Sequence, residues 1–169
     1  PLGETAGTTV RVASRDASAW STGESLSAGL AGDAASPDIA CDGTDTYVAW
    51  EQSGPDIGSA LYYAHGEEGI WSLPLLLSRS TPAERPSLAA GPGRVVGVAW
   101  DAGDTLLFCA VSARAVTLQP ERITTNLYGV RDVALAFDPR GSAHAVWSTR
   151  DSAGAWALAA SVALAAGRS

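Results

Sequence analysis

The stretch Tyr47-Val48-Ala49-Trp50 returns twice in closely similar form, as Gly97-Val98-Ala99-Trp100 and as His144-Ala145-Val146-Trp147. The three tryptophans follow one another at spacings of 50 and 47 residues. A repeat of this length that contains short apolar segments is typical of the blades of a β-propeller. The repeat therefore predicts an all-β fold in which the three tryptophans occupy equivalent, buried places.

Short apolar segments that end at turn residues accompany each tryptophan at matching offsets. The segments before the tryptophans are residues 37–43, 86–92 and 133–139, and those after them are residues 60–64, 105–109 and 155–159. A fourth segment is visible at residues 71–77 and 116–120, where a proline suits an outer edge strand. Each unit is thus expected to contain up to four antiparallel strands, the first of them innermost.

The repeat begins partway through a unit. Residues 9–13 resemble a third strand and residues 19–22 a fourth, because Trp20-Ser21 lies 51 residues before Trp71-Ser72. The alanine-rich residues 153–166 favour helix intrinsically, but the register of the repeat places a third strand there. Residues 162–169 are expected to be a poor fourth strand or a frayed end.

One propeller segment of about three to three and a half four-stranded blades is therefore predicted over residues 1–169, against the 4 to 8 blades of a closed ring. Its parts are a half blade at 9–27, blades at 36–80 and 85–125, and a partial blade at 131–169. Open repeat ends need a partner or a cap. We expect self-association, or further blades that close the ring.

Charge and hydropathy exclude several classes of function. The chain has 11 arginines, no lysine and 18 acidic residues, for a net charge of −7, and no basic cluster that would bind nucleic acid. No apolar run is long enough to span a membrane, and no signal peptide is present in the chain as given. The arginine- and alanine-rich composition suggests a bacterial protein, which we expect to be extracellular or in the cell envelope.

The cysteines and histidines carry no metal-ligand spacing. Cys41 and Cys109 fall in different units, and two buried, inert thiols are the favoured interpretation, although a disulfide stays open. His144 is expected to be packed within a strand or to face the central pore, and His65 to be solvated at a strand end. No metal and no cofactor are expected.

The residues Ser14-Arg15-Asp16-Ala17-Ser18-Ala19-Trp20 resemble a shortened Asp-box, the Ser-x-Asp-x-Gly-x-Thr-Trp hairpin of sialidases and other propellers with bacterial neuraminidase (BNR) repeats. Residues 64–71 resemble a degraded copy. Neither has the threonine, and the second also lacks the serine and the aspartate. The resemblance spans residues 9–160 and implies a sialidase-like propeller, in which the acidic side chain hydrogen-bonds its own turn and the tryptophan packs beneath the hairpin.

In that family the Asp-boxes are structural and lie away from the functional face. The resemblance implies that this face carries the connections from fourth to first and from second to third strands. In this chain they are residues 28–36, 79–85, 125–132, 51–59, 101–104 and 148–154. Charged residues are concentrated in these connections, as they generally are in the loops of soluble proteins.

A sialidase needs arginines for the substrate carboxylate, a tyrosine nucleophile assisted by a glutamate, and an aspartic acid. Arg85 and Arg131 occupy nearly equivalent positions before the first strands, and Tyr128 with Glu84 is the candidate nucleophile pair. The candidate ligand-binding residues are Arg85, Arg131, Tyr128, Glu84, Asp101 and Asp132. The arginines could equally form bidentate pairs with acidic neighbours.

A partial ring cannot assemble a site that several blades must share, so the chain alone is not expected to be an enzyme. The sequence favours a non-catalytic propeller scaffold or ligand-binding module, in which exposed Tyr128 or Trp156 stacks on a glycan. The alternative is a fragment of a sialidase-like glycoside hydrolase whose remaining blades are absent.

Overall fold

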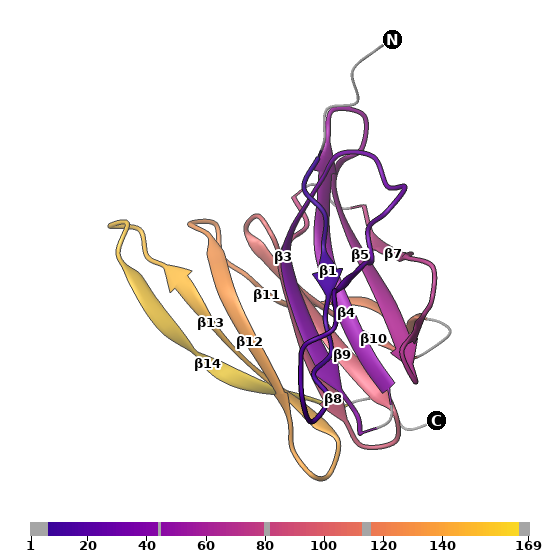
Figure 1. Ribbon diagram of the computed structural model, residues 1–169. Helices are drawn as coiled ribbons and strands as arrows, with labels where there is room; N and C mark the ends of the chain where they lie inside the picture. The colour runs from indigo at the N-terminus through magenta and orange to yellow at the C-terminus, as the bar shows by residue number, and fades with distance from the viewer. Residues whose placement is uncertain (1–6, 44, 80–81, 113–115, 166–169) are drawn as a thin grey trace.

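The computed structural model describes residues 7–43, 45–79, 82–112 and 116–165. The described residues form antiparallel strands joined by turns and contain no helix (Figure 1). The strands are β1 (Arg11–Val12), β2 (Glu24–Ser25), β3 (Asp33–Cys41), β4 (Asp45–Gly54), β5 (Gly58–Glu67), β6 (Ile70–Trp71), β7 (Leu75–Ser78), β8 (Glu84–Gly91), β9 (Val95–Ala102), β10 (Thr105–Val111), β11 (Val116–Thr125), β12 (Val130–Phe137), β13 (Ser142–Arg150) and β14 (Trp156–Ala165). The described part of the chain accordingly contains no helix that could cross a membrane.

Consecutive strands pair with one another to give separate antiparallel sheets. The order is β3-β4-β5-β6 in the first large sheet, with β7 also on β5, then β8-β9-β10-β11, and then β12-β13-β14. Strands β1 and β2 form a small sheet before them. The prediction of an all-β fold is therefore confirmed, and each tryptophan stretch lies in the second strand of its sheet.

The sheets share apolar cores with their neighbours in chain order. Trp50 packs with Val10 and Leu26 of the amino-terminal segment, while Trp100 packs in a cluster with residues of β4 and β5 such as Tyr47. Trp147 packs against Phe108 and other residues of the preceding sheet. All three tryptophans are buried, and each contributes to the core that its sheet shares with the sheet before it.

The first strands of the three larger sheets lie together, with β8 in contact with both β3 and β12. Equivalent hydrogen bonds connect them: the Leu88 amide donates to Asp38 Oδ2 over 2.7 Å, and the Leu135 amide donates to the Ser87 hydroxyl over 3.2 Å. Asp38 also accepts a hydrogen bond from the amide of Ile39 on its second oxygen. Asp38 of β3 and Ser87 of β8 thus each fix the position of the next first strand along its axis.

The amino-terminal segment repeats the later hairpin with a shift of 51 residues. Arg11 pairs with Ser25 as Tyr62 pairs with Leu76. The expected fourth strand at residues 19–22 is nevertheless wrong, because only an isolated bridge between Arg15 and Trp20 forms there and the paired strand is β2. This difference arises because the two arms of the hairpin separate beyond the Arg15–Trp20 bridge and pair again only at β1 and β2.

The hairpin tip has the turn that the Asp-box resemblance implies. Asp16 Oδ1 accepts hydrogen bonds from the amides of Ser18 and Ala19 and from the Ser18 hydroxyl. These bonds lower the pKa of Asp16. Trp20, however, does not pack beneath the hairpin, since 67% of it is exposed.

Three further expectations need correction. The outer segment at residues 71–77 is divided into β6 and β7, because Pro74 has no amide to donate to the ladder. Residues 162–165 continue the third strand β14 rather than forming a fourth, and residues 166–169 lie outside the described residues. Both thiols are free, but only Cys109 is buried, whereas Cys41 is exposed.

Candidate functional site

The candidate site lies where the first strands begin and the second strands end. At this edge each first strand has a β-bulge, which interrupts the register after Ala35, Glu84 and Arg131. The residue after each of these adopts a left-handed backbone, with φ of 50° at Ser36, 47° at Arg85 and 55° at Asp132. Such conformations are costly for residues other than glycine and concentrate at functional sites.

The bulges revise the sequence alignment of the two candidate arginines. Arg85 is structurally equivalent to Asp132, and Arg131 to Glu84, one position earlier. Both arginines lie within β8 and β12 rather than before them. A bulge could not be foreseen from the sequence, because neither arginine nor aspartate marks a left-handed position as glycine does.

Arg85 holds a buried carboxylate. Its Nε lies 2.8 Å and its Nη2 2.5 Å from Asp101 Oδ2, and its Nη1 lies 3.2 Å from Glu84 Oε2. Asp101 is only 1% exposed and lies within β9, so its expected place in the connection at residues 101–104 is wrong. Burial, together with the negative charges of Asp132 and Glu84, raises the pKa of Asp101 against the lowering effect of Arg85. For Arg85, burial acts against the charged form, but Asp101, Glu84 and Asp132 outweigh it and raise the pKa.

Glu51 belongs to the same group of charges. It lies opposite Ala35 at the end of the β3–β4 ladder, as Asp101 lies opposite Glu84. Burial raises the pKa of Glu51, the negative charge of Glu84 raises it further, and Arg85 lowers it. We call Glu51, Glu84, Arg85, Asp101 and Asp132 the charged cluster.

Arg131 connects the charged cluster with an aromatic residue. Its Nε lies 3.1 Å from Asp132 Oδ2, and its guanidinium carbon lies 3.7 Å from the ring centroid of Trp156. The guanidinium carbon of Arg150 lies 5.9 Å from the same centroid. The two cations therefore hold the ring in place by cation–π attraction.

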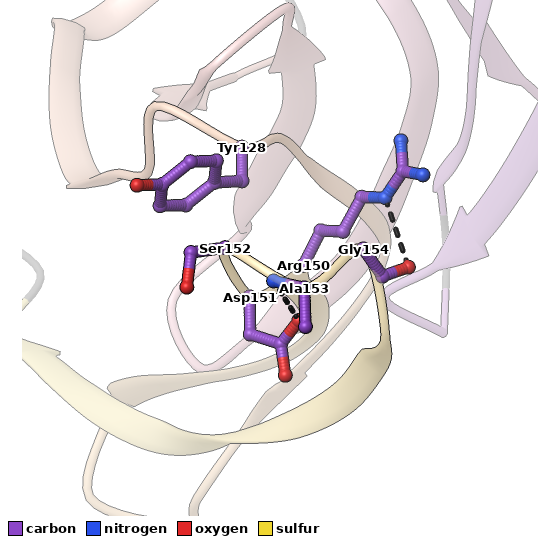
Figure 2. Close-up of a pocket in the computed structure, with 6 residues that line it drawn as sticks. All are labelled: Tyr128, Arg150, Asp151, Ser152, Ala153 and Gly154. Atoms are coloured by element: carbon purple, nitrogen blue, oxygen red, sulfur yellow. Dashed lines mark hydrogen bonds between the residues drawn. The ribbon is translucent and has the colours of Figure 1, made fainter.

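A surface pocket of about 250 Å³ lies beside this corner. Its lining residues are Tyr128, Arg150, Asp151, Ser152, Ala153 and Gly154. Figure 2 shows the Tyr128 ring opposite Ser152, while the Arg150 side chain extends to the Gly154 carbonyl, to which its Nε donates over 3.0 Å. Asp151 Oδ1 accepts from the amides of Ala153 and Ala155, both over 2.9 Å, so the turn beneath Tyr128 is well ordered by its own hydrogen bonds.

The predicted site residues thus fall into two groups. Glu84, Arg85, Asp101 and Asp132 meet in the charged cluster, and Arg131 contacts it through Asp132. Tyr128 lines the pocket instead, and no hydrogen bond joins it to Glu84 within the described residues. The sequence placed Glu51 in a connection of the expected functional face but not among the candidate ligand-binding residues, although its place directly after Trp50 matches that of Asp101 after Trp100.

Comparison with known proteins supports the fold alone. No protein family and no curated protein matches the sequence. Among solved structures, an alpha-L-arabinofuranosidase from Lactobacillus brevis is similar, with a TM-score of 0.54 and 16% sequence identity. The match covers 80% of this chain and 51% of that chain. Most of this chain therefore has a fold similar to that of about half of the arabinofuranosidase chain.

Proposed function

We propose that this chain is a carbohydrate-binding module built from sialidase-like propeller blades, and that it binds a neutral sugar at the Tyr128 pocket. The observation that carries the proposal is an aromatic ring, 55% exposed, that faces a hydroxyl and ordered polar groups across a pocket. Sugars stack their apolar ring faces on aromatic side chains and hydrogen-bond to polar neighbours.

The packing of the sheets supports the propeller arrangement. The sheets stack in chain order through apolar cores, their first strands lie together, and the left-handed positions recur in each of these strands. Radially arranged blades have these features. Because the similar arabinofuranosidase is by its name an enzyme that acts on a sugar, its fold is also compatible with a carbohydrate ligand.

The polar groups around Tyr128 favour a neutral sugar over an acidic one. Ser152 and the free oxygen of Asp151 can accept hydrogen bonds from sugar hydroxyls, whereas Arg150 is engaged with Gly154 and Trp156. Arg85 and Arg131, which a sialic acid carboxylate would need, already pair with Asp101 and Asp132. The pocket accordingly offers hydrogen-bond acceptors for sugar hydroxyls, whereas the nearby arginines are already paired with other groups.

A glycan array followed by titration of the best neutral oligosaccharide tests this proposal. We expect the Tyr128→Ala variant to weaken binding by about 5-fold or more, because the substitution removes the stacking surface, and stacking of a nucleobase on an aromatic side chain is worth roughly 1–3 kcal/mol. Trp20→Ala is the matched control, because Trp20 is also an exposed aromatic residue at a turn but lies on the amino-terminal hairpin. Wild-type protein that binds no glycan, or equal losses in the two variants, would contradict the proposal.

A second candidate is part of a glycoside hydrolase. Glycosidases pair two carboxyl groups, of which the acid has a raised pKa, and Glu51 beside Glu84 has this character. Release of a chromogenic aryl group from an α-L-arabinofuranoside tests it. Hydrolysis that is lost in both Glu51→Gln and Glu84→Gln would favour the enzyme, whereas hydrolysis that survives in either variant would exclude this pair.

A further inference from the structure

A second group of polar side chains lies at the opposite end of the first large sheet from Glu51. Asp45 begins β4, and His65 and Glu67 lie two residues apart near the end of β5, so that they project from one face. Asp45 pairs with Glu67 across the ladder, and His65 pairs with Tyr47. One ligand atom from each of Asp45, His65 and Glu67 lies within 4.8 Å of the others.

The carboxylate at the centre of this group is buried with incomplete hydrogen bonding. Asp45 is 2% exposed, and its Oδ1 has no hydrogen-bond partner. His65 Nε2 lies 3.5 Å from Asp45 Oδ2 and likewise has no hydrogen-bond partner. The expectation that His65 is solvated is therefore wrong, since only 11% of its side chain is exposed. Buried polar atoms without partners destabilise a fold unless they bind something.

We propose that Asp45, His65 and Glu67 bind a zinc ion. A tetrahedral zinc site with bonds of about 2.0–2.2 Å places neighbouring ligand atoms roughly 3.3 Å apart. The 3.5 Å between His65 Nε2 and Asp45 Oδ2 is close to this separation. A histidine with two carboxylates suits zinc better than magnesium or calcium, which prefer oxygen ligands alone.

Two of the three ligands border a surface pocket from which an ion can approach, whereas Asp45 lies buried behind them. His65 and Glu67 line a surface pocket of about 340 Å³. Glu67 has a side chain that is 61% exposed, so it can turn towards the ion at little cost. The sequence did not suggest this site, because Asp45 is separated from the other two ligands by the β4–β5 hairpin.

Arg94 competes with the ion. Its Nη2 lies 3.1 Å from Asp45 Oδ2 and 4.0 Å from Glu67 Oε1, where it neutralises part of the negative charge. The Arg94 side chain is 60% exposed and belongs to the turn between β8 and β9, so it can move into water when zinc binds. Removal of Arg94 should therefore tighten zinc binding.

Isothermal titration of the metal-free protein with zinc chloride tests the proposal. We expect one ion per chain in the wild type, tighter binding in Arg94→Gln, and binding at least about 10-fold weaker in both Glu67→Gln and His65→Gln, since even outer-sphere changes cost 10- to 100-fold. Glu67→Gln is the safer variant, because its exposed side chain contributes little to folding. His144→Gln is the matched control: His144 Nε2 also faces a carboxylate, 3.7 Å from Asp138 Oδ2, but belongs to no such group of three.

Several outcomes would overturn the assignment. They are an absence of zinc binding in both the wild type and Arg94→Gln, unchanged affinity in Glu67→Gln, and an equal loss of affinity in His144→Gln. Unchanged affinity in Arg94→Gln would also exclude Asp45 as a ligand, because Arg94 lies on its oxygen. A melting temperature that zinc raises in the wild type but not in Glu67→Gln would support the site independently.

Discussion

Glu51 is a residue of the charged cluster whose surroundings raise its pKa. It is half-buried, and Glu84 is near enough for its charge to add to the effect of burial. Both effects favour the neutral acid in the folded protein. In the unfolded chain the same carboxyl returns to its ordinary pKa of 4.5.

Glu51→Gln should therefore stabilise the protein more at pH 7 than at pH 4. The folded state binds the Glu51 proton more tightly than the unfolded state, so the contribution of Glu51 to stability is present below pH 4.5 and is lost as pH rises through the higher folded pKa. Thermal melts of the wild type and the variant between pH 4 and pH 7 measure this difference. A difference in melting temperature that does not change with pH would mean that the folded pKa of Glu51 is not raised.

The tryptophans of β9 and β14 illustrate how burial, rather than residue type, decides the role of a side chain. Trp100 in β9 is completely buried between two sheets, whereas Trp156 at the start of β14 is 39% exposed beneath Arg131. Their side chains are identical, so a comparison of the two isolates the effect of position.

Trp100→Ala should cost about 3–5 kcal/mol of unfolding free energy, because the substitution removes apolar contacts and leaves a cavity. Trp156→Ala should cost less, since part of its ring already contacts water. Equilibrium unfolding in urea gives both values. The reverse order would show that β14 contributes more to the shared core than its exposure indicates.

The strands that the sequence predicted best are those fixed by the repeat. The 51-residue register predicted that the amino-terminal hairpin copies the later hairpin, although it misplaced the fourth strand at residues 19–22. The repeat also placed a third strand at residues 155–159 against the helical preference of alanine, and β14 begins there but extends further, to Ala165. Ladder pairing with β13 outweighs that preference. The left-handed bulges at Arg85 and Asp132 were not predictable, because they depend on contacts between strands rather than on local residue type.

The candidate sites likewise divide into residues that the repeat predicts and residues that only the contacts between strands reveal. Arg85, Glu84 and Asp132 were singled out because the repeat places them at one edge, and the structure brings them together with Asp101. The Asp45 group was missed, since burial of a carboxylate at a turn leaves no signal in the sequence.

In the molecule as a whole, large apolar side chains are exposed on the two outermost large sheets. Ile39 of β3 is 53% exposed and Leu158 of β14 is 81% exposed. Exposed apolar faces of this kind favour association with a complementary surface. The predicted closure of a ring would cover both faces.

We therefore expect the chain to associate at micromolar concentration, and Leu158→Asp to weaken that association. Sedimentation velocity over a range of concentrations measures it. Leu73→Asp is the control, because Leu73 is 85% exposed but lies between β6 and β7, outside the sheets. A wild-type monomer at all concentrations would refute the expectation.

The hydrogen bonds from Asp38 and Ser87 to the next first strand also bear on how the sheets resist sliding. Apolar contact is non-directional, so two sheets held by it alone can shift along their strands at small cost. A carboxylate that bonds both Ile39 and Leu88 allows a single alignment, and Ser87 does the same for Leu135. Position 134, where β12 has alanine, offers no such acceptor, so a surface that packs beyond β12 must obtain its alignment from other groups.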